Sequence, residues 1–261
     1  MKKSSFNMDE KRSWRSSVGI LQNGQSWESF NKNIKPTPPS SSMVNAGIIA
    51  FVATVFFIIS FTSPYWLQSY MYTYNDFSNM GLWEFCFNGF RYPKYQFDYK
   101  FMGCNYVFSK EYRIIWTWML PAWFMATQSF MTIALLASLS TLVLISMVLM
   151  RWPLQFVMRY EWHLTAVCFI FQAITVVSIF FAVLIFGVMC WSRDWLLNPN
   201  FNYLSWSYAF AVIAGGIHAF AGLTLLHESY EARDRKRQAA SVMHMEPQGQ
   251  YGVEMSAHGY I

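Results

Sequence analysis

The chain has 261 residues, of which 54% are hydrophobic and only 13% are charged, with a formal net charge of +5 at pH 7. Soluble chains average about 25% charged residues, so the composition argues against buried helices in a large soluble core. It favours a membrane protein whose positive charge reflects membrane orientation, and it gives no reason to expect a nucleic-acid partner.

Residues 1–43 form a polar segment with seven Lys and Arg residues. A cleavable signal peptide would place its apolar region within about the first 15 to 30 residues, so we expect the first apolar stretch to stay as a membrane anchor. The segment lacks the apolar residues that a packed core needs, and we expect a disordered cytoplasmic tail.

Four stretches contain no Asp, Glu, Lys or Arg, namely residues 36–75, 114–150, 162–192 and 195–227. About 20 apolar residues cross a bilayer as a helix, since every backbone amide must be satisfied internally. We therefore expect a membrane domain at 44–226, an all-α four-helix transmembrane bundle with spans at 44–63, 124–149, 164–189 and 206–226.

The distribution of Lys and Arg predicts the orientation of these spans. With the N-terminus inside, thirteen of the 19 Lys and Arg residues lie on the cytoplasmic side and six lie outside. Because Lys and Arg are enriched in cytoplasmic segments, we expect both termini inside, including a C-terminal tail at 227–261. The basic run at 233–237 is most simply a stop signal beside anionic lipid headgroups, and specific phosphoinositide binding is the alternative.

The first outer loop, residues 64–123, has the pattern of a small β-sheet. Residues 94–101 alternate between aromatic and polar side chains, which predicts a half-buried antiparallel strand with one face formed by Tyr95, Phe97, Tyr99 and Phe101. Asn88-Gly89 is the dipeptide that two-residue hairpin turns prefer, and it predicts a turn at that position. A lone hairpin is marginal in water, so the sheet must rest on the helix ends or be tied covalently.

Cys86 and Cys104 are the two cysteines of this loop, with 17 residues between them. In an oxidising compartment they predict a disulfide, which chain-entropy estimates value at about 3 kcal/mol. A zinc site is the competing interpretation, but the loop has no His to complete a tetrahedral set.

The fourth predicted helix has small residues at four-residue intervals, Ala211, Gly215 and Ala219, which allow close helix packing. His218 lies beside them and should face protein. It predicts either a proton relay or a neutral histidine hydrogen-bonded to Gln172, and the absence of charged residues in any span favours the second.

No motif predicts catalysis. The outer loops contain no His, and the chain has no Cys-x-x-Cys, no metal-spaced His pair and no glycine-rich phosphate loop. We expect a protein that is not an enzyme and that needs no cofactor or metal. Four uncharged spans without a detectable inverted repeat also give little support for transport.

The order Trp66, Gly81-Leu82-Trp83, Cys86, Cys104 in the first loop resembles the signature of the claudin and peripheral myelin protein superfamily. Residues 120–128 and Asp194–Pro199 are also similar to claudin patterns. The likeness covers about residues 44–230 and is strongest to divergent invertebrate septate-junction members of the Pasiflora type. Four features depart from the claudin pattern: the long N-terminal tail, the wider cysteine spacing, Gln128 where many claudins place an Arg, and neutral Asn105 near where charge-selective pore formers often carry a charge.

The resemblance implies a four-helix transmembrane bundle with a small extracellular antiparallel β-sheet. Trp66 is then either a membrane-interface anchor or, as we prefer, the residue that packs under Gly81-Leu82-Trp83 and seats the sheet, with Gly81 allowing close backbone approach.

The resemblance also implies a plasma-membrane protein of lateral cell junctions. Such a protein forms a paracellular barrier with copies of itself or other claudin-like proteins, in the same membrane and across cells. In the second loop, residues 190–205, the expected contact residues are Trp195, Leu196, Leu197, Asn198, Pro199, Phe201 and Tyr203. The alternative is an auxiliary subunit that modulates an ion channel or receptor.

The C-terminal residues Tyr260 and Ile261 resemble a PDZ ligand, because a large apolar last side chain with a free carboxylate suits the PDZ pocket. The alternative is a tail that has no partner at its end.

Overall fold

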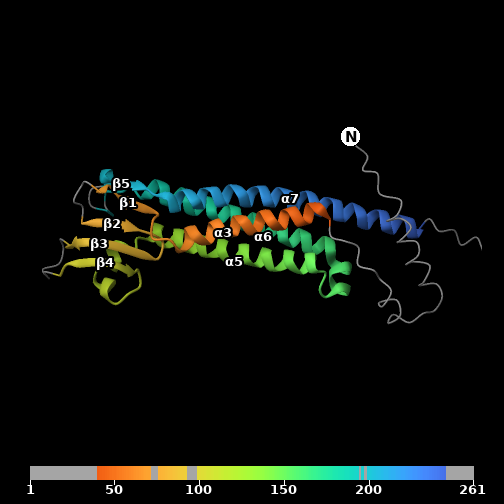
Figure 1. The fold of residues 1–261 in the computed structure, drawn as a ribbon, viewed down its shortest axis with the longest axis horizontal. Helices are drawn as coiled ribbons and strands as arrows, with labels where there is room; N and C mark the ends of the chain where they lie inside the picture. Colours follow the sequence, from red (N-terminus) through yellow and green to blue (C-terminus); the bar gives the residue numbers. More distant parts are fainter. Residues whose placement is uncertain (1–39, 72–75, 93–98, 194, 197–198, 245–261) are drawn as a thin grey trace, which may run out of the picture. The chain divides into compact units, whose positions relative to one another are not determined.

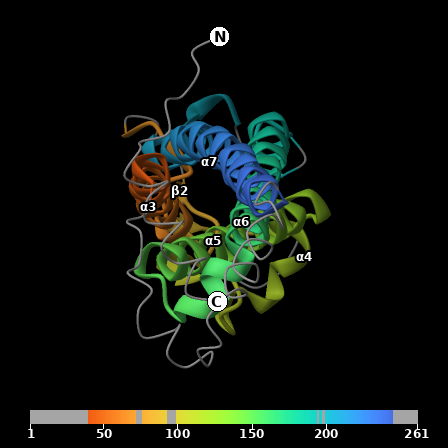
Figure 2. The same cartoon turned by 90° about the vertical axis from the view of Figure 1, so that its right-hand side faces the viewer.

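The computed structural model describes residues 40–71, 76–92, 99–193, 195–196 and 199–244. Its main elements are four long helices, α3 (Ser41–Thr62), α5 (Ala122–Met150), α6 (Leu154–Met189) and α7 (Trp206–His244). The helices lie side by side: α5 contacts α3 and α6, and α7 contacts α3 and α6 (Figures 1 and 2).

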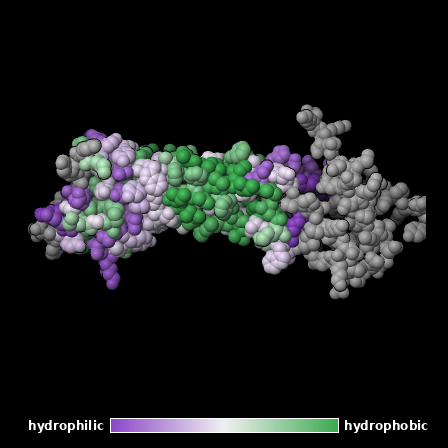
Figure 3. Space-filling model, viewed as in Figure 1, coloured by the Kyte–Doolittle hydropathy of each residue, from purple (hydrophilic) through white to green (hydrophobic). Residues whose placement is uncertain are grey.

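Each of these helices is long and apolar enough to cross a membrane. Apolar side chains cover the middle of the helices in a belt, while polar side chains gather at both ends of the described chain (Figure 3). The fold class expected from the sequence, a four-helix transmembrane bundle with a small sheet, is confirmed.

Local chemistry sets the helix ends. The Ser40 hydroxyl accepts a hydrogen bond from the Met43 amide at 3.1 Å and caps the start of α3. That helix ends at Thr62, because Pro64 disfavours a helical conformation at Ser63. Helix α5 ends at Met150, because the next residue, Arg151, adopts a left-handed backbone with φ of 50°.

Two helices extend beyond the expected spans. Helix α6 begins at Leu154 and bends at Tyr160, where the backbone is not helical. Helix α7 continues to His244, far past position 226. The apolar pattern marks only the part of a helix that lies in lipid, whereas Glu, Ala, Arg and Lys continue α7 because they are good helix formers.

A five-stranded antiparallel sheet lies at one end of the bundle, here called the sheet end (Figure 1). The strand order is β4-β3-β2-β1-β5. The strands are β1 (Leu67–Ser69), β2 (Phe77–Met80), β3 (Glu84–Phe90), β4 (Phe101–Tyr106) and β5 (Asn202–Leu204). Short helical turns flank them: η3 (Glu111–Ile114), α4 (Trp116–Met119) and η4 (Pro199–Phe201).

The hairpin turn predicted at Asn88-Gly89 is wrong. Both residues lie inside β3, where Asn88 pairs with Met102 and Phe90 pairs with Phe101, so Gly89 is the extra residue of a β-bulge. Gly89 has φ of 83°, the positive value that the dipeptide signal anticipates, but the chain uses it to bend a continuing strand.

The predicted strand at 94–101 is also revised. Strand β4 begins at Phe101, and residues 99 and 100 are not in a strand. Tyr95 and Phe97 lie outside the described residues. Of the predicted face, Phe101 is buried and Tyr99 is 54% exposed. Most of the aromatic face comes from β3 and the segment after β4, through ring contacts among Phe85, Phe87, Phe90, Phe101, Tyr112 and Trp118.

Polar contacts between buried side chains join the helices. Thr54 and Ser138 connect α3 to α5 at 2.7 Å. Gln172 Nε2 lies 2.6 Å from His218 Nδ1 and donates to the His218 carbonyl at 3.1 Å, which connects α6 to α7. The contact predicted between these two residues is therefore present in the structure.

The small residues of α7 differ in burial. Ala211 is fully buried, while Gly215 and Ala219 are half-buried. A Cβ at Gly215 would lie 3.1 Å from Ile179 of α6, so glycine permits close approach of the two helices at this level.

A double-mutant cycle on Gln172→Ala and His218→Ala should show a coupling energy of about 0.6 to 1.7 kcal/mol, the range for interhelical hydrogen bonds in membranes. The readout is the free energy of unfolding in detergent. Ser140→Ala is the control with little effect, because its hydroxyl bonds only within α5. Strict additivity of the two substitutions would contradict the hydrogen bond.

Candidate functional site

Trp66 lies between the sheet and the bundle and is fully buried. Its indole Nε1 donates to the Ser60 carbonyl of α3 at 2.8 Å, and its backbone amide donates to Met80 of β2 at 2.8 Å. The ring contacts Phe186 of α6 and Tyr208 of α7, with centroids 5.0 and 5.7 Å away. Trp66 thus joins the sheet to three helices. With no exposed surface, it cannot act as an anchor at the lipid interface.

Gly81 lies where the β2–β3 connection crosses the end of α3. A Cβ at this position would be 2.3 Å from the Ser63 carbonyl oxygen and 2.7 Å from Pro64 Cα, both backbone atoms. Side chains essentially never approach backbone this closely, so only glycine fits. The Asn79 amide adds a hydrogen bond to the Pro64 carbonyl at 2.8 Å, across the same contact.

Leu82 and Trp83 complete this contact. Leu82 is fully buried, and its carbonyl accepts a hydrogen bond of 2.7 Å from the Gln128 amide of α5. The Trp83 ring packs against Phe61 of α3, with centroids 5.2 Å apart. Gln128 stands where many claudins place an Arg, and its neutral amide links α5 to the β2–β3 connection through this hydrogen bond.

The disulfide predicted between Cys86 and Cys104 is present. The two residues are direct cross-strand partners in β3 and β4, with Cα atoms 4.0 Å apart. The bond closes an 18-position separation and locks the register of two strands whose pairing is interrupted by the bulge at Gly89.

The second loop contributes a strand to the same sheet. Strand β5 pairs with β1, so that Leu67 faces Leu204 and Ser69 faces Asn202. A three-residue strand is too short to produce a periodicity signal, so the residue pattern does not predict it. The sheet thus includes residues from both loops.

Trp195 and Leu196, expected to contact a neighbouring cell, are buried at 4% and 2% exposure. The Trp195 ring lies 4.6 Å from Trp123 and 5.8 Å from Phe124, and its Nε1 donates to the Met119 carbonyl. The expectation for these two residues is wrong, because a hydrophobic loop residue can turn toward its own helices as readily as toward a partner.

The other predicted contact residues of this loop differ in exposure. Phe201 is 46% exposed, whereas Pro199 and Tyr203 are half-buried. Tyr203 lies against Tyr70, with ring centroids 4.9 Å apart. Leu197 and Asn198 lie outside the described residues, as do Tyr260 and Ile261 of the C-terminal tail.

Tyr112 is a buried residue that the sequence patterns did not identify. Its hydroxyl donates to the Phe85 carbonyl at 2.9 Å, inside the aromatic face of the sheet. Burial raises the pKa of this phenol to about 12, so the group stays neutral at physiological pH. A buried hydroxyl needs such a partner, and the residue fixes the segment after β4 beneath the sheet.

Apolar side chains are nonetheless exposed at the sheet end. They gather on β4 and the segment after it, at Met102, Tyr106, Phe108 and Ile114, and near the β1–β5 edge, at Tyr70, Met71 and Phe201. Met71 and Met102 are the most exposed, at 91% and 67%. Among the described residues, no group of three or more His, Cys, Asp or Glu could hold a metal. The exposed apolar groups at this end are thioether, aromatic and aliphatic side chains.

Four membrane-crossing helices with a disulfide-tied sheet across one end define a four-pass membrane protein. The sequence model of the family described as PMP-22/EMP/MP20/Claudin tight junction matches residues 51–227. The chain therefore belongs to this family of structural membrane proteins, as its resemblance indicated. No curated protein matches the chain.

Replacing Gly81 with Ala should reduce the free energy of unfolding by about 3 kcal/mol or more, because the new methyl group meets backbone atoms that cannot turn aside. Gly216→Ala on α7 is the matched control, since its Cβ would meet nothing within 4 Å. It should be neutral or slightly stabilising. Thermal unfolding of both purified variants measures the difference, and equal stability would contradict the close contact.

Proposed function

We propose that this protein assembles side by side within one membrane and across the gap between cells, and so forms or organises a paracellular barrier at lateral cell junctions. Family membership supports a junctional membrane protein in general. The observation that carries the proposal is the pair of exposed apolar surfaces on a sheet that is itself rigidly seated.

The orientation that we propose places both termini in the cytoplasm and the sheet outside the cell. The excess of Lys and Arg on the side of the termini supports it. So does the Cys86–Cys104 disulfide, since disulfides persist in oxidising extracellular surroundings.

Strand β4 is the surface proposed for assembly in the plane of the membrane. It is terminal in the sheet order, so its outer backbone groups lack a partner strand within the described sheet. Met102 and Tyr106 are exposed on it. Contacts of this kind combine backbone pairing with burial of large side chains, which favours a second copy or a related chain as partner.

The surface proposed for contact across cells lies at the opposite edge of the sheet, near β1 and β5. Tyr70, Met71 and Phe201 are exposed there, next to the half-buried Tyr203. These residues come from both loops, and the backbone amide of Tyr70 donates to the Phe201 carbonyl at 3.0 Å. A shared surface of this kind depends on correct seating of the sheet.

Two finer assignments belong to the same proposal. The first is a place among divergent septate-junction members of the Pasiflora type, to which the likeness of residues 44–230 is strongest. Tyr260 and Ile261 are proposed to bind a PDZ scaffold, which a C-terminal peptide carrying Ile261→Ala should fail to bind.

Depletion of the protein should make an epithelium permeable to dye, and the wild-type chain should restore the barrier. A variant with Met102→Lys and Tyr106→Lys should reach the lateral membrane yet fail to restore it, since charges block pairing at β4. Trp83→Ala and Cys86→Ser should fail earlier and accumulate before the cell surface.

Two control variants change Met125, an exposed residue of α5. Met125→Lys adds a charge away from β4 and reports a defect in membrane insertion, whereas Met125→Leu keeps the position apolar. A failure seen only in the β4 variant therefore reports loss of pairing. If the β4 variant restored the barrier fully, lateral assembly through this strand would be refuted. If the protein instead co-purified with a channel and altered its currents while permeability stayed normal, an auxiliary subunit would be the better description.

A further inference from the structure

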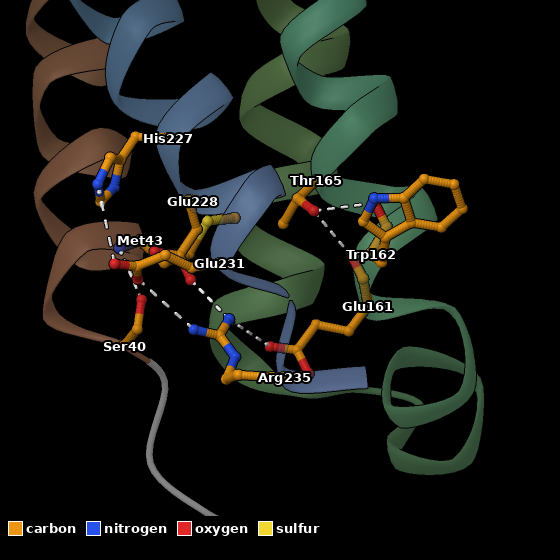
Figure 4. A network of polar contacts seen from close by, with 9 residues as sticks. All are labelled: Ser40, Met43, Glu161, Trp162, Thr165, His227, Glu228, Glu231 and Arg235. Atoms are coloured by element: carbon orange, nitrogen blue, oxygen red, sulfur yellow. Dashed lines mark hydrogen bonds and ion pairs between the residues drawn. The ribbon is translucent and has the colours of Figure 1, made fainter. Parts of the chain in front are cut away.

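The end of the bundle opposite the sheet contains the basic run at 233–237 on α7. Arg235 is the member of this run that faces the bundle. It pairs with Glu228 at 2.8 Å and with Glu231 at 3.7 Å on its own helix, and with Glu161 of α6 at 3.6 Å (Figure 4). Glu228 is 2% exposed and lies on the same helix as Arg235, whereas the pair between Arg235 and Glu161 is the one that links α7 to α6.

The other basic residues of the run do not take part in this set of ion pairs. Arg233, Lys236 and Arg237 are exposed and make no ion pair within the part of the chain that the structure describes. Arg233 and Arg237 are four positions apart and so share a helix face with Tyr230, which is 59% exposed. We call Arg233, Lys236 and Arg237 the basic ridge. Two exposed carboxylates lie beside it, Asp234 and Glu231. Glu231 is paired with Arg235 at 3.7 Å, so the three basic residues of the ridge outnumber the one remaining carboxylate, Asp234.

The basic ridge begins beside an aromatic residue at the border of the apolar belt. The Arg233 guanidinium carbon lies 5.9 Å from the centre of the Trp162 ring of α6. Trp162 follows Glu161 and is the first residue of the uncharged stretch of α6. Tryptophan is enriched at the level of lipid headgroups, so this pair marks where a headgroup would meet the protein.

We propose that the basic ridge, together with Trp162, binds the headgroup of an anionic phospholipid in the inner leaflet. This inference rests on the orientation proposed above, which places the far end of the bundle in the cytoplasm. The inner leaflet is the anionic one, and each Lys or Arg held near it strengthens attraction about fivefold.

The arrangement divides one run of sequence into two roles. Arg235 pairs with three carboxylates and holds α7 against α6, so its positive charge is fully offset within the protein and is not available to an anionic ligand. The basic ridge offers charge at the membrane border, beside apolar helix surfaces that suit acyl chains. A phospholipid can use both the positive charge, through its headgroup, and the apolar surfaces, through its acyl chains. Free phosphate would use only the positive charge.

The test uses the purified full chain in neutral detergent, titrated with short-chain phosphatidylserine and, separately, short-chain phosphatidylcholine. Native mass spectrometry measures the fraction of protein that retains each lipid. Replacing Arg233 and Arg237 with Gln should weaken phosphatidylserine binding about 25-fold, because two contributions of about fivefold are lost. Phosphatidylcholine retention should not change.

The matched control replaces Lys110 and Arg113, two exposed basic residues at the sheet end, with Gln. It removes the same net charge and should leave phosphatidylserine binding intact. Arg235→Gln should lower thermal stability and also keep binding. Equal weakening by the control, or no weakening by the ridge variant, would overturn the proposed site.

A second measurement, the accessibility of a C-terminal tag on intact cells, tests separately whether the basic ridge lies on the cytoplasmic side, as the proposed orientation requires. A tag reached only after permeabilisation agrees with an inner-leaflet site. A tag reached from outside would overturn the inner-leaflet assignment even with binding intact. Loss of lipid binding with normal barrier restoration would refute the site and leave the barrier proposal standing.

Discussion

The structure depends on one close contact, between the backbone at Gly81 and the end of α3. The space there admits no side chain, since a Cβ would lie 2.3 Å from the Ser63 carbonyl oxygen. Around it, Trp66 donates to Ser60, Asn79 to Pro64 and Gln128 to Leu82. The strands are short, and the buried side chains of Trp66 and Leu82 beside this contact supply the apolar packing against the helices that stabilises such a sheet.

Two neighbouring contacts explain why loops that are distant in the sequence form one surface. Trp66 belongs to the first loop and contacts Tyr208 at the start of α7, while β5 of the second loop pairs with β1 directly after Trp66. The disulfide then fixes β4 to β3 at the other edge. Exposed side chains at both edges are thereby held in fixed positions, as a surface that pairs with other copies requires.

Composition and uninterrupted apolar stretches sufficed to predict the four helices, because lipid imposes one solution on such segments. The disulfide followed from the two cysteines of the first loop, and the preference for Trp66 as the seat of the sheet came from the resemblance to the claudin superfamily. The bulge at Gly89 did not follow from the sequence, since a local preference for positive φ does not tell a turn from a bulge, and the three residues of β5 carry no periodic signal. The sequence also does not show that Trp195 turns toward its own helices, or that Arg235 forms ion pairs while Arg233 stays exposed. Both outcomes are decided by packing between segments that are distant in the sequence.

Hydrogen exchange of the β2 and β3 amides, followed by mass spectrometry on the purified full chain, tests the seating of the sheet most directly. Trp66→Ala should raise exchange across residues 77–90 at least tenfold, whereas Trp152→Ala, at a 75% exposed position, should leave it unchanged. If Trp66→Ala left these amides as protected as in the wild-type chain, the sheet would be held by something other than its contact with the bundle.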